Sequence, residues 1–532
     1  MKAMPAIERK DGQWKLLVDG KPMILLAGEV HNSSTSSLAY MEEVFDKGKQ
    51  LGMNCLLLPV TWELIEPEEG HFDFSLVDGL IEQARARKMK IGLLWFGSWK
   101  NAQSTYAPEW VKTDLERFRR AQIEKGKNYV TVKKFYNLPY SPLSYLCEET
   151  MQADARAFAA LMAEIRRVDS EEHTVVTVQV ENETGLMAGA RDHSDEADAI
   201  FNAPVPADFA AYMYTHTGSM VPEVREAVRS GRLGGSWEEM FGDQADELFS
   251  AYHVARYVNT VAAAGKREYP LPMSVNCWLN QKGAKAGAYP SGGPISKVRE
   301  VWNFCAPAID LYAPDIYLPD FTGICDEYTR RGEPLYIPEC PTHAYAASRN
   351  LLCIGKYHAL CYSPFGIEDM GLPLNPSQMA LFGADASDPA LAKSQDAETY
   401  GRINRLLQGM MDELLAAYGT EHLDAASGEF QEESAFHMDG VEIRVKFTEQ
   451  EGGCLVLRKD RQEFYILAHR TWLHFLSDRP ELPGIDILAF EEGSFENGEW
   501  KRVRRLNGDE VVANTFTAEE PVLLRVKAFT YA

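Results

Sequence analysis

Two glutamates that follow apolar segments, Glu183 and Glu339, are the residues best suited to chemistry. Glu183 lies in the stretch 177–185, TVQVENETG, where an apolar run becomes abruptly polar, and Glu339 directly follows the apolar segment 334–338. Burying charged groups at the end of an apolar strand costs free energy, which favours a functional reason for them. Two carboxyl groups that face each other could act as proton donor and nucleophile in glycosidic bond cleavage with retention.

Eight apolar segments of strand length, separated by helix-like segments, must position these glutamates. The strands are expected at residues 23–27, 54–58, 90–94, 174–178, 271–276, 309–312, 334–338 and 357–362. This alternation predicts a parallel sheet. Polar residues after nearly every strand favour a closed (β/α)8 TIM barrel, in which the fourth and seventh strands face each other across the mouth. No glycine fingerprint follows the first strand, which argues against a nucleotide-binding sheet.

The other strand ends supply candidate substrate-binding residues. Asn182, directly before Glu183, could hydrogen-bond a sugar 2-hydroxyl, and Tyr317 could donate a hydrogen bond to Glu339. Each tryptophan could be a platform for a sugar ring or a core residue, and Glu181 is expected to be structural. In chain order the candidates are Glu29, His31, Trp62, Glu63, Trp95, Asn182, Asn276, Trp278, Asp315 and Tyr317.

The chain is expected to form two domains. The barrel occupies residues 1–420 and includes an N-terminal hairpin at 6–22. Beyond Gly419 the pattern changes to alternation, as in residues 441–447, and Asn-Gly turns occur at 497–498 and 507–508. Strict alternation with such turns predicts antiparallel strands buried on one face. Residues 425–532 are therefore expected to form a small β-sandwich-like accessory domain that supplies no catalytic residue.

Composition narrows the classes of partner. The formal net charge of −24 disfavours a nucleic-acid partner, and no apolar run approaches the roughly 18 residues of a membrane span. The first residues, MKAMPAIERKDGQWK, lack a hydrophobic signal region. The cysteines are scattered along the sequence, which predicts that they are reduced thiols in the core. We therefore expect a cytoplasmic protein without metal or organic cofactor that acts on a carbohydrate. The chain could also form a homo-oligomer.

Two motifs resemble known glycosidases. The stretch QVENETG resembles the QxENEYG motif of glycoside hydrolase family 35, the β-galactosidases, with Thr184 in place of its tyrosine. Residues 62–74, WELIEPEEGHFDF, resemble that family's WNxHEPxxGxFDF stretch, with Glu63 and Ile65 replacing asparagine and histidine. The second motif equally resembles family 42. The resemblance spans about residues 20–370 and implies a retaining barrel glycosidase with Glu183 as acid/base and Glu339 as nucleophile.

The sequence therefore favours a retaining exo-β-glycosidase, with β-galactosidase as the leading activity. A β-glucosidase or a transglycosylase could use the same scaffold, and a sugar-binding protein that has lost catalysis is an alternative from another class. A metal-dependent barrel hydrolase is disfavoured, because the strand ends lack the His-x-His set that metal ligation would need.

Overall fold

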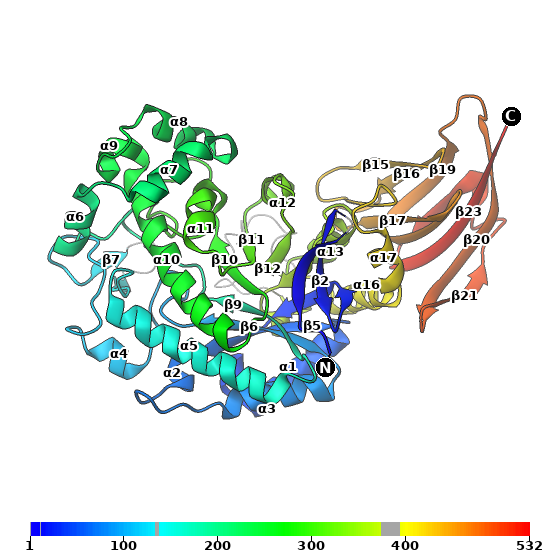
Figure 1. Ribbon diagram of the computed structural model, residues 1–532. Helices are drawn as coiled ribbons and strands as arrows, with labels where there is room; N and C mark the ends of the chain where they lie inside the picture. The colour runs from blue at the N-terminus through cyan, green and yellow to red at the C-terminus, as the bar shows by residue number, and fades with distance from the viewer. Residues whose placement is uncertain (1, 11, 133–137, 374–393) are drawn as a thin grey trace.

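A closed barrel of eight parallel strands forms the larger part of the molecule (Figure 1). The computed structural model describes residues 2–10, 12–132, 138–373 and 394–532. The strand order is β11-β10-β9-β6-β5-β4-β13-β12, and a hydrogen bond of 2.9 Å from the N–H of Ile316, the residue directly after β11, to Glu339 O of β12 links the two ends of the sheet. The predicted TIM barrel is thus confirmed. Its strands are β4 (Leu25–Glu29), β5 (Cys55–Thr61), β6 (Lys90–Phe96), β9 (Val175–Val180), β10 (Met273–Trp278), β11 (Leu311–Asp315), β12 (Tyr336–Cys340) and β13 (Cys361–Pro364).

Most of these strands end later in the sequence than expected. Polar residues that were expected to follow the strands lie within them, including Glu29, Asp315 and Glu339. A change from apolar to polar residues therefore does not mark the end of backbone pairing here. The ladder requires only backbone groups, and a polar side chain at a strand tip can point into the mouth.

Helices surround the barrel and pack apolar side chains against it, and α13 (Ala346–Gly355) is buried along its whole length. In α1 (Leu38–Gln50), for example, Met41, Val44 and Phe45 are buried and Ser37 caps the first turn. The other helices between or after the strands are α3 (Ser75–Ala86), α5 (Glu148–Asp169), α10 (Ala245–Glu268), α11 (Arg299–Cys305), α12 (Phe321–Thr329), α16 (Ala397–Gly409) and α17 (Met411–Ala417). Short helices in the connections are α2 (Trp62–Ile65), α4 (Glu109–Thr113), α6 (Asp195–Asn202), α7 (Ala207–Thr215), α8 (Pro222–Ser230) and α9 (Trp237–Phe241). Helices α16 and α17 meet at Met410.

The N-terminal segment packs against the interior of the barrel. It forms three strands, not the expected two-stranded hairpin: β1 (Ala6–Lys10), β2 (Gln13–Val18) and β3 (Lys21–Met23). Leu16 and Val18 of β2 share a core cluster with residues of the barrel strands, among them Leu25, Leu57 and Tyr336. These contacts fill the interior of the barrel with side chains and leave the functional residues to the strand tips.

The C-terminal residues form two antiparallel sheets, as expected. The order is β14-β17-β18-β23-β20-β21 in one sheet and β15-β16-β19-β22 in the other, and Figure 1 shows them beside the barrel in yellow to red. The strands are β14 (Leu423–Ser427), β15 (Glu433–Met438), β16 (Val441–Phe447), β17 (Gly453–Asp460), β18 (Glu463–His469), β19 (Thr471–Ser477), β20 (Gly484–Glu496), β21 (Glu499–Arg505), β22 (Thr515–Ala518) and β23 (Val522–Tyr531). A separate apolar cluster fills the space between the sheets.

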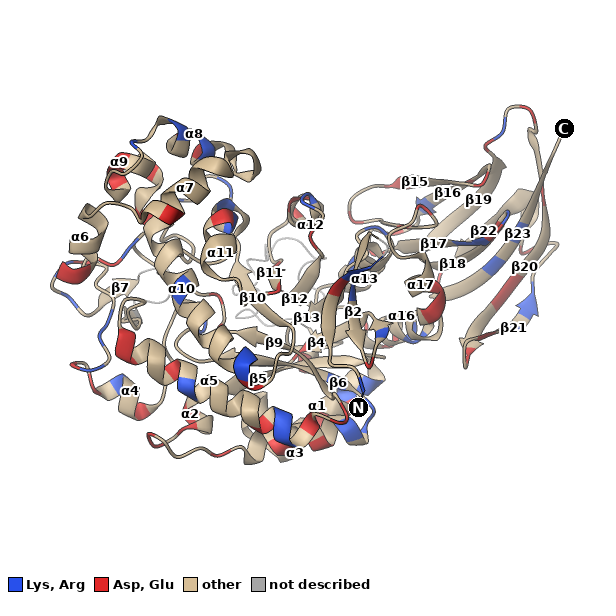
Figure 2. Cartoon of the chain, in the orientation of Figure 1, with Lys and Arg blue, Asp and Glu red and all other residues tan. Residues whose placement is uncertain are grey.

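Charged residues of both signs are interspersed on the outer helices, for example on α3 and α5 (Figure 2). All nine cysteines are buried and none forms a disulfide, as expected for core thiols. Among the described residues, no helix is both long and apolar enough to cross a membrane.

A buried ion pair connects the barrel to the C-terminal sheets. Arg349 of α13 donates to both carboxylate oxygens of Glu429, with Nε 2.7 Å from Oε2, and its guanidinium lies over the ring of Phe321. The Arg349 side chain is only 4% exposed. Removing one partner of such a pair leaves an uncompensated buried charge.

We predict that Glu429→Ala lowers the free energy of unfolding by about 3 kcal/mol, because Arg349 then lacks its counter-ion. The matched control is Glu433→Ala, which removes an exposed pair with Lys446 and should cost less than about 0.5 kcal/mol. Urea unfolding followed by circular dichroism measures both variants. Equal effects of the two substitutions would show that the buried pair does not stabilise the domain contact.

Candidate active site

Glu183 and Glu339 lie at the tips of strands four and seven of the barrel. β9 ends at Val180, and the chain then turns through residues 181–184. The pairing of β12 with β13 shifts register between Ile337 and Cys340, which fits the missing N–H of Pro338. Both glutamates are buried, with exposed fractions of 6% and 7%. The charge of Glu339 acts on Glu183, which places the two carboxyl groups in one electrostatic environment.

Glu183 is held in its protonated form near neutral pH. Burial and the negative charge of Glu339 raise the pKa of Glu183 to about 8, although Lys100 and a hydrogen bond with Asp315 act in the opposite direction. Its backbone N–H donates to Asn276 Oδ1 at 2.9 Å, and Asn276 Nδ2 donates to Asp315 Oδ2 at 2.8 Å. A carboxyl group that keeps its proton until the reaction begins suits the role of general acid.

Glu339 is held as a hydrogen-bond acceptor. The hydroxyl of Tyr317 donates to Oε1 of Glu339 at 2.6 Å, which is the hydrogen bond expected from the sequence. Burial and the charge of Glu339 raise the pKa of Tyr317 well above its usual value, so the phenol remains a donor. The other carboxylate oxygen, Oε2, is buried without a hydrogen-bond partner among the described residues. A fixed carboxylate with one free oxygen suits a nucleophile.

Further polar atoms at the strand tips are buried without a hydrogen-bond partner among the described residues. Glu29 Oε1 and Asn182 Nδ2 are two of them, in addition to Glu339 Oε2. Burial and the charge of Glu339 raise the pKa values of both Glu29 and Asp315 well above their usual range. Buried polar groups normally have partners, so unpartnered atoms at strand tips indicate positions for the hydroxyl groups of a ligand.

Lys100 belongs to the carboxyl cluster and was not found by the sequence analysis. It follows β6, its side chain is buried, and Nζ donates to Asn182 Oδ1 at 3.1 Å. Burial acts to lower the pKa of Lys100, but the charges of Glu339, Glu183 and Glu29 outweigh it and raise that pKa. Lys100 thus supplies positive charge to the carboxyl cluster. The signal in the sequence is its position in GSWK, the four residues that follow the third strand.

Three other candidates lie at strand tips with contacts of their own. His31 Nε2 lies 2.9 Å from Asp369 Oδ2, and its side chain is about one third exposed. Trp278 is the half-buried last residue of β10 and lies opposite Asp315 in the sheet. Glu63 forms an ion pair of 3.2 Å with Lys112. None of these contacts prevents His31 or Trp278 from contacting a sugar.

The predicted sugar contacts of Trp62 and Trp95 are corrected by the structure. Both rings are fully buried in the apolar layer between strands and helices. Trp62 Nε1 donates to Glu66 Oε2 at 2.8 Å, and Trp95 Nε1 donates to Asp154 Oδ1 at 2.9 Å. Both tryptophans are therefore core residues, because the ring faces and the only polar atom are already engaged by protein.

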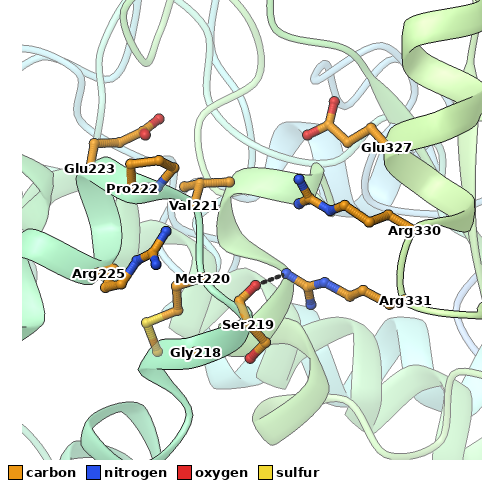
Figure 3. Close-up of a pocket in the computed structure, with 10 residues that line it drawn as sticks. All are labelled: Gly218, Ser219, Met220, Val221, Pro222, Glu223, Arg225, Glu327, Arg330 and Arg331. Carbon is orange, nitrogen blue, oxygen red and sulfur yellow. Dashed lines mark hydrogen bonds between the residues drawn. The ribbon is translucent and has the colours of Figure 1, made fainter.

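A separate cleft of about 520 Å³ lies between α8 and the end of α12. Arg225 and Arg330 extend into it from opposite sides, and Arg331 donates to Ser219 O (Figure 3). Glu223 and Glu327 also line it. No residue that lines this cleft belongs to a strand tip, so it is distinct from the carboxyl cluster.

Residues 15–116 match the family model for glycosyl hydrolases family 35. A β-galactosidase from Xanthomonas manihotis is 31% identical over 100 residues, which are 17% of this chain and 17% of that protein. Residues 400–517 match a domain of unknown function, DUF5597. The matches to family 35 and to this relative are confined to small parts of the chains. Glu183 and Glu339 lie outside residues 15–116, so their assignment depends on the site geometry.

Two solved structures are similar to this chain at low sequence identity. A β-galactosidase from Bacillus circulans sp. alkalophilus has a TM-score of 0.44 and 13% identity, covering 74% of this chain and 57% of that one. The catalytic domain of a β-amylase from Paenibacillus polymyxa has a TM-score of 0.45 and 12% identity, covering 68% and 98%.

The raised pKa of Glu183 predicts an alkaline limit to activity. Only its protonated form can donate to a leaving group, so any glycosidase activity that uses this proton should fall about tenfold per pH unit in kcat/KM once the pH exceeds about 8, with an alkyl β-galactoside as the test substrate. The measurement is kcat/KM against pH. For Glu183→Ala acting on a dinitrophenyl galactoside, which leaves without protonation, the alkaline limb should disappear. A limb that persists in that variant would assign the titration to another group.

Proposed function

We propose that this protein is a retaining exo-β-glycosidase, with β-galactosidase as the favoured activity. The observation that carries the proposal is the buried pair of carboxyl groups at strand tips four and seven. Glu183 keeps its proton and Glu339 accepts a hydrogen bond from Tyr317. The match of residues 15–116 to family 35 and the β-galactosidase relative support the choice of sugar.

In the proposed first step, Glu339 Oε2 attacks the anomeric carbon. The glycosidic C–O bond breaks as Glu183 gives its proton to the departing oxygen, which leaves as an alcohol. The sugar is then held as an ester of Glu339. Retaining enzymes need about 5 to 5.5 Å between their two carboxyl groups for this geometry.

In the second step, Glu183 acts as a base. It removes a proton from water, whose oxygen attacks the anomeric carbon and breaks the ester to Glu339. Two inversions at the same carbon restore the original β configuration. Both glutamates return to their starting protonation states, so the cycle needs no cofactor.

The remaining strand-tip residues bind and orient the sugar in this proposal. Asn182 Nδ2 is buried without a protein partner among the described residues, which supports a role as donor to the 2-hydroxyl. Glu29 Oε1 accepts from another hydroxyl, and Trp278 and His31 contact the sugar from neighbouring strand tips. Asn276 and Asp315 hold the backbone and side chain of Glu183.

A panel of aryl β-glycosides tests the proposed activity. The galactoside should be hydrolysed fastest, because the relative that matches is a β-galactosidase. Glu339→Gln removes the nucleophile and should lower kcat by at least about 10⁴-fold on every member of the panel. Glu171→Gln, at an exposed position away from the strand tips, is the matched control.

The alternatives predict different results on the same panel. A faster glucoside would favour a β-glucosidase, and product that appears on an added sugar acceptor would favour a transglycosylase. If every glycoside is inert while galactose still binds, the protein is a sugar-binding protein and the proposed activity is wrong.

A further inference from the structure

Two buried carboxyl groups that the proposed mechanism does not use lie at the turn that carries the acid/base Glu183. They belong to Asp154 of α5 and Glu181 at the end of β9, and both residues are 0% exposed. Among the described residues, neither forms an ion pair with a lysine, arginine or histidine. Two adjacent buried carboxylates without a cation would repel each other strongly, so the pair must hold a proton.

Asp154 is surrounded by hydrogen-bond donors. Its Oδ1 accepts from Trp95 Nε1 at 2.9 Å. Its Oδ2 accepts from Ser98 N at 3.1 Å, from Ser98 Oγ at 2.6 Å and from the Tyr257 hydroxyl at 3.2 Å. Because four donors already converge on Asp154, it is the hydrogen-bond acceptor of the pair, and a proton shared by the two carboxyl groups belongs on Glu181.

Glu181 has the complementary pattern. Its Oε2 accepts from Trp99 N at 2.8 Å, whereas Oε1 is buried and has no donor among the described residues. A Cβ on Gly97 would lie 2.7 Å from both Glu181 Oε1 and Asp154 Oδ1, so these two oxygens flank one point. A proton on Glu181 Oε1 would satisfy both oxygens at once, by donation to Asp154.

The pair joins the loop after β6 to the residues of the catalytic turn. Asn182 N donates to Trp99 O at 3.2 Å, and Ala102 N donates to Glu183 O at 3.0 Å. Glu181 and Glu183 have φ values of 62° and 44°, a left-handed conformation that costs about 1 to 3 kcal/mol at a non-glycine residue. Such a strained turn persists only where surrounding contacts hold it.

We propose that Glu181 is a neutral acid that positions Glu183, by donating its proton to Asp154 and accepting from Trp99 N. This proposal depends on the role of Glu183 in the proposed function. In this proposal Glu181 acts through Glu183 and not on the substrate, because its carboxyl group lies against Trp99 N and Asp154 of α5. It fixes the backbone turn whose next-but-one residue carries the acid/base carboxyl group.

The electrostatics of the site support this protonation. Burial raises the pKa of Glu181 well above its usual value, and the charge of Asp154 and the hydrogen bond to it act in the same direction. The groups that face Glu181 are Asp154 of α5, Tyr257 of α10 and the loop residues Ser98 and Trp99.

Two substitutions of Glu181 separate the proposed role from packing. Glu181→Gln keeps the pattern, because an amide N–H can donate to Asp154 while the amide oxygen accepts from Trp99 N. Its kcat on an alkyl galactoside should stay close to the wild-type value. Glu181→Leu keeps the size but loses both hydrogen bonds, and its kcat on that substrate should fall by about 100-fold through the misplaced acid. Glu171→Gln, at an exposed position, is the control.

Substrates with different leaving groups distinguish a displaced Glu183 from a partly unfolded protein. A displaced Glu183 slows the alkyl galactoside far more than a dinitrophenyl galactoside, which needs no proton. Equal losses on both substrates in Glu181→Leu would reduce the pair to a packing role and overturn the proposal. Loss of activity in Glu181→Gln as large as in Glu181→Leu would also overturn it.

Infrared spectroscopy tests the proton independently of activity. The wild-type minus Glu181→Gln difference spectrum should contain the carbonyl stretch of a protonated carboxylic acid, and its absence would overturn the proposal. This measurement remains decisive if Glu181→Leu does not fold. A wild-type protein that is inert on all glycosides would instead refute the proposed function, while the infrared result would still decide the state of the pair.

Discussion

Repulsion among buried carboxyl groups is the constraint on which the site depends. Glu29, Glu183, Asp315 and Glu339 act on one another, and Lys100 is the cation among them. Two unit charges about 5 Å apart repel by roughly 3 kcal/mol at an effective dielectric constant of about 20. Burial and this repulsion raise the pKa values of Glu29 and Asp315 well above their usual range and that of Glu183 to about 8. This constraint creates a proton donor beside an acceptor at neutral pH.

The barrel limits the repulsion between the four carboxyl groups by distributing them over four strands. Each comes from a different strand tip, and the interior below is filled by side chains such as Leu57 and Tyr336. The loop after β6 contributes the rest. It supplies Lys100 and, through Trp99 and Ala102, the backbone contacts that hold the turn of Glu183. Rigid backbone elements thus fix both the charges and their directions.

Sequence reasoning located the strand tips well but could not place every side chain. Glu183, Asn276, Asp315, Tyr317 and Glu339 were found because polar residues interrupt apolar strands, and the structure brings all five together. Trp62 and Trp95 lie at strand tips as well, yet face the helices. The position of a tryptophan along the sequence does not show whether its ring points into the barrel mouth or toward the helices. Lys100 and Asp154 were missed because their partners are distant in the sequence, and only the folded chain brings them together.

Trapping the covalent intermediate is the measurement that tests the central claim most directly. A 2-deoxy-2-fluoro-β-galactosyl fluoride carries a good leaving group, while its fluorine slows hydrolysis of the ester more than formation. Incubation should inactivate the protein with a mass increase of one fluorosugar, and peptide mapping should place the label on Glu339. A label on another residue, or a first-formed product of inverted configuration, would contradict the assignment of Glu339 as the nucleophile of a retaining glycosidase.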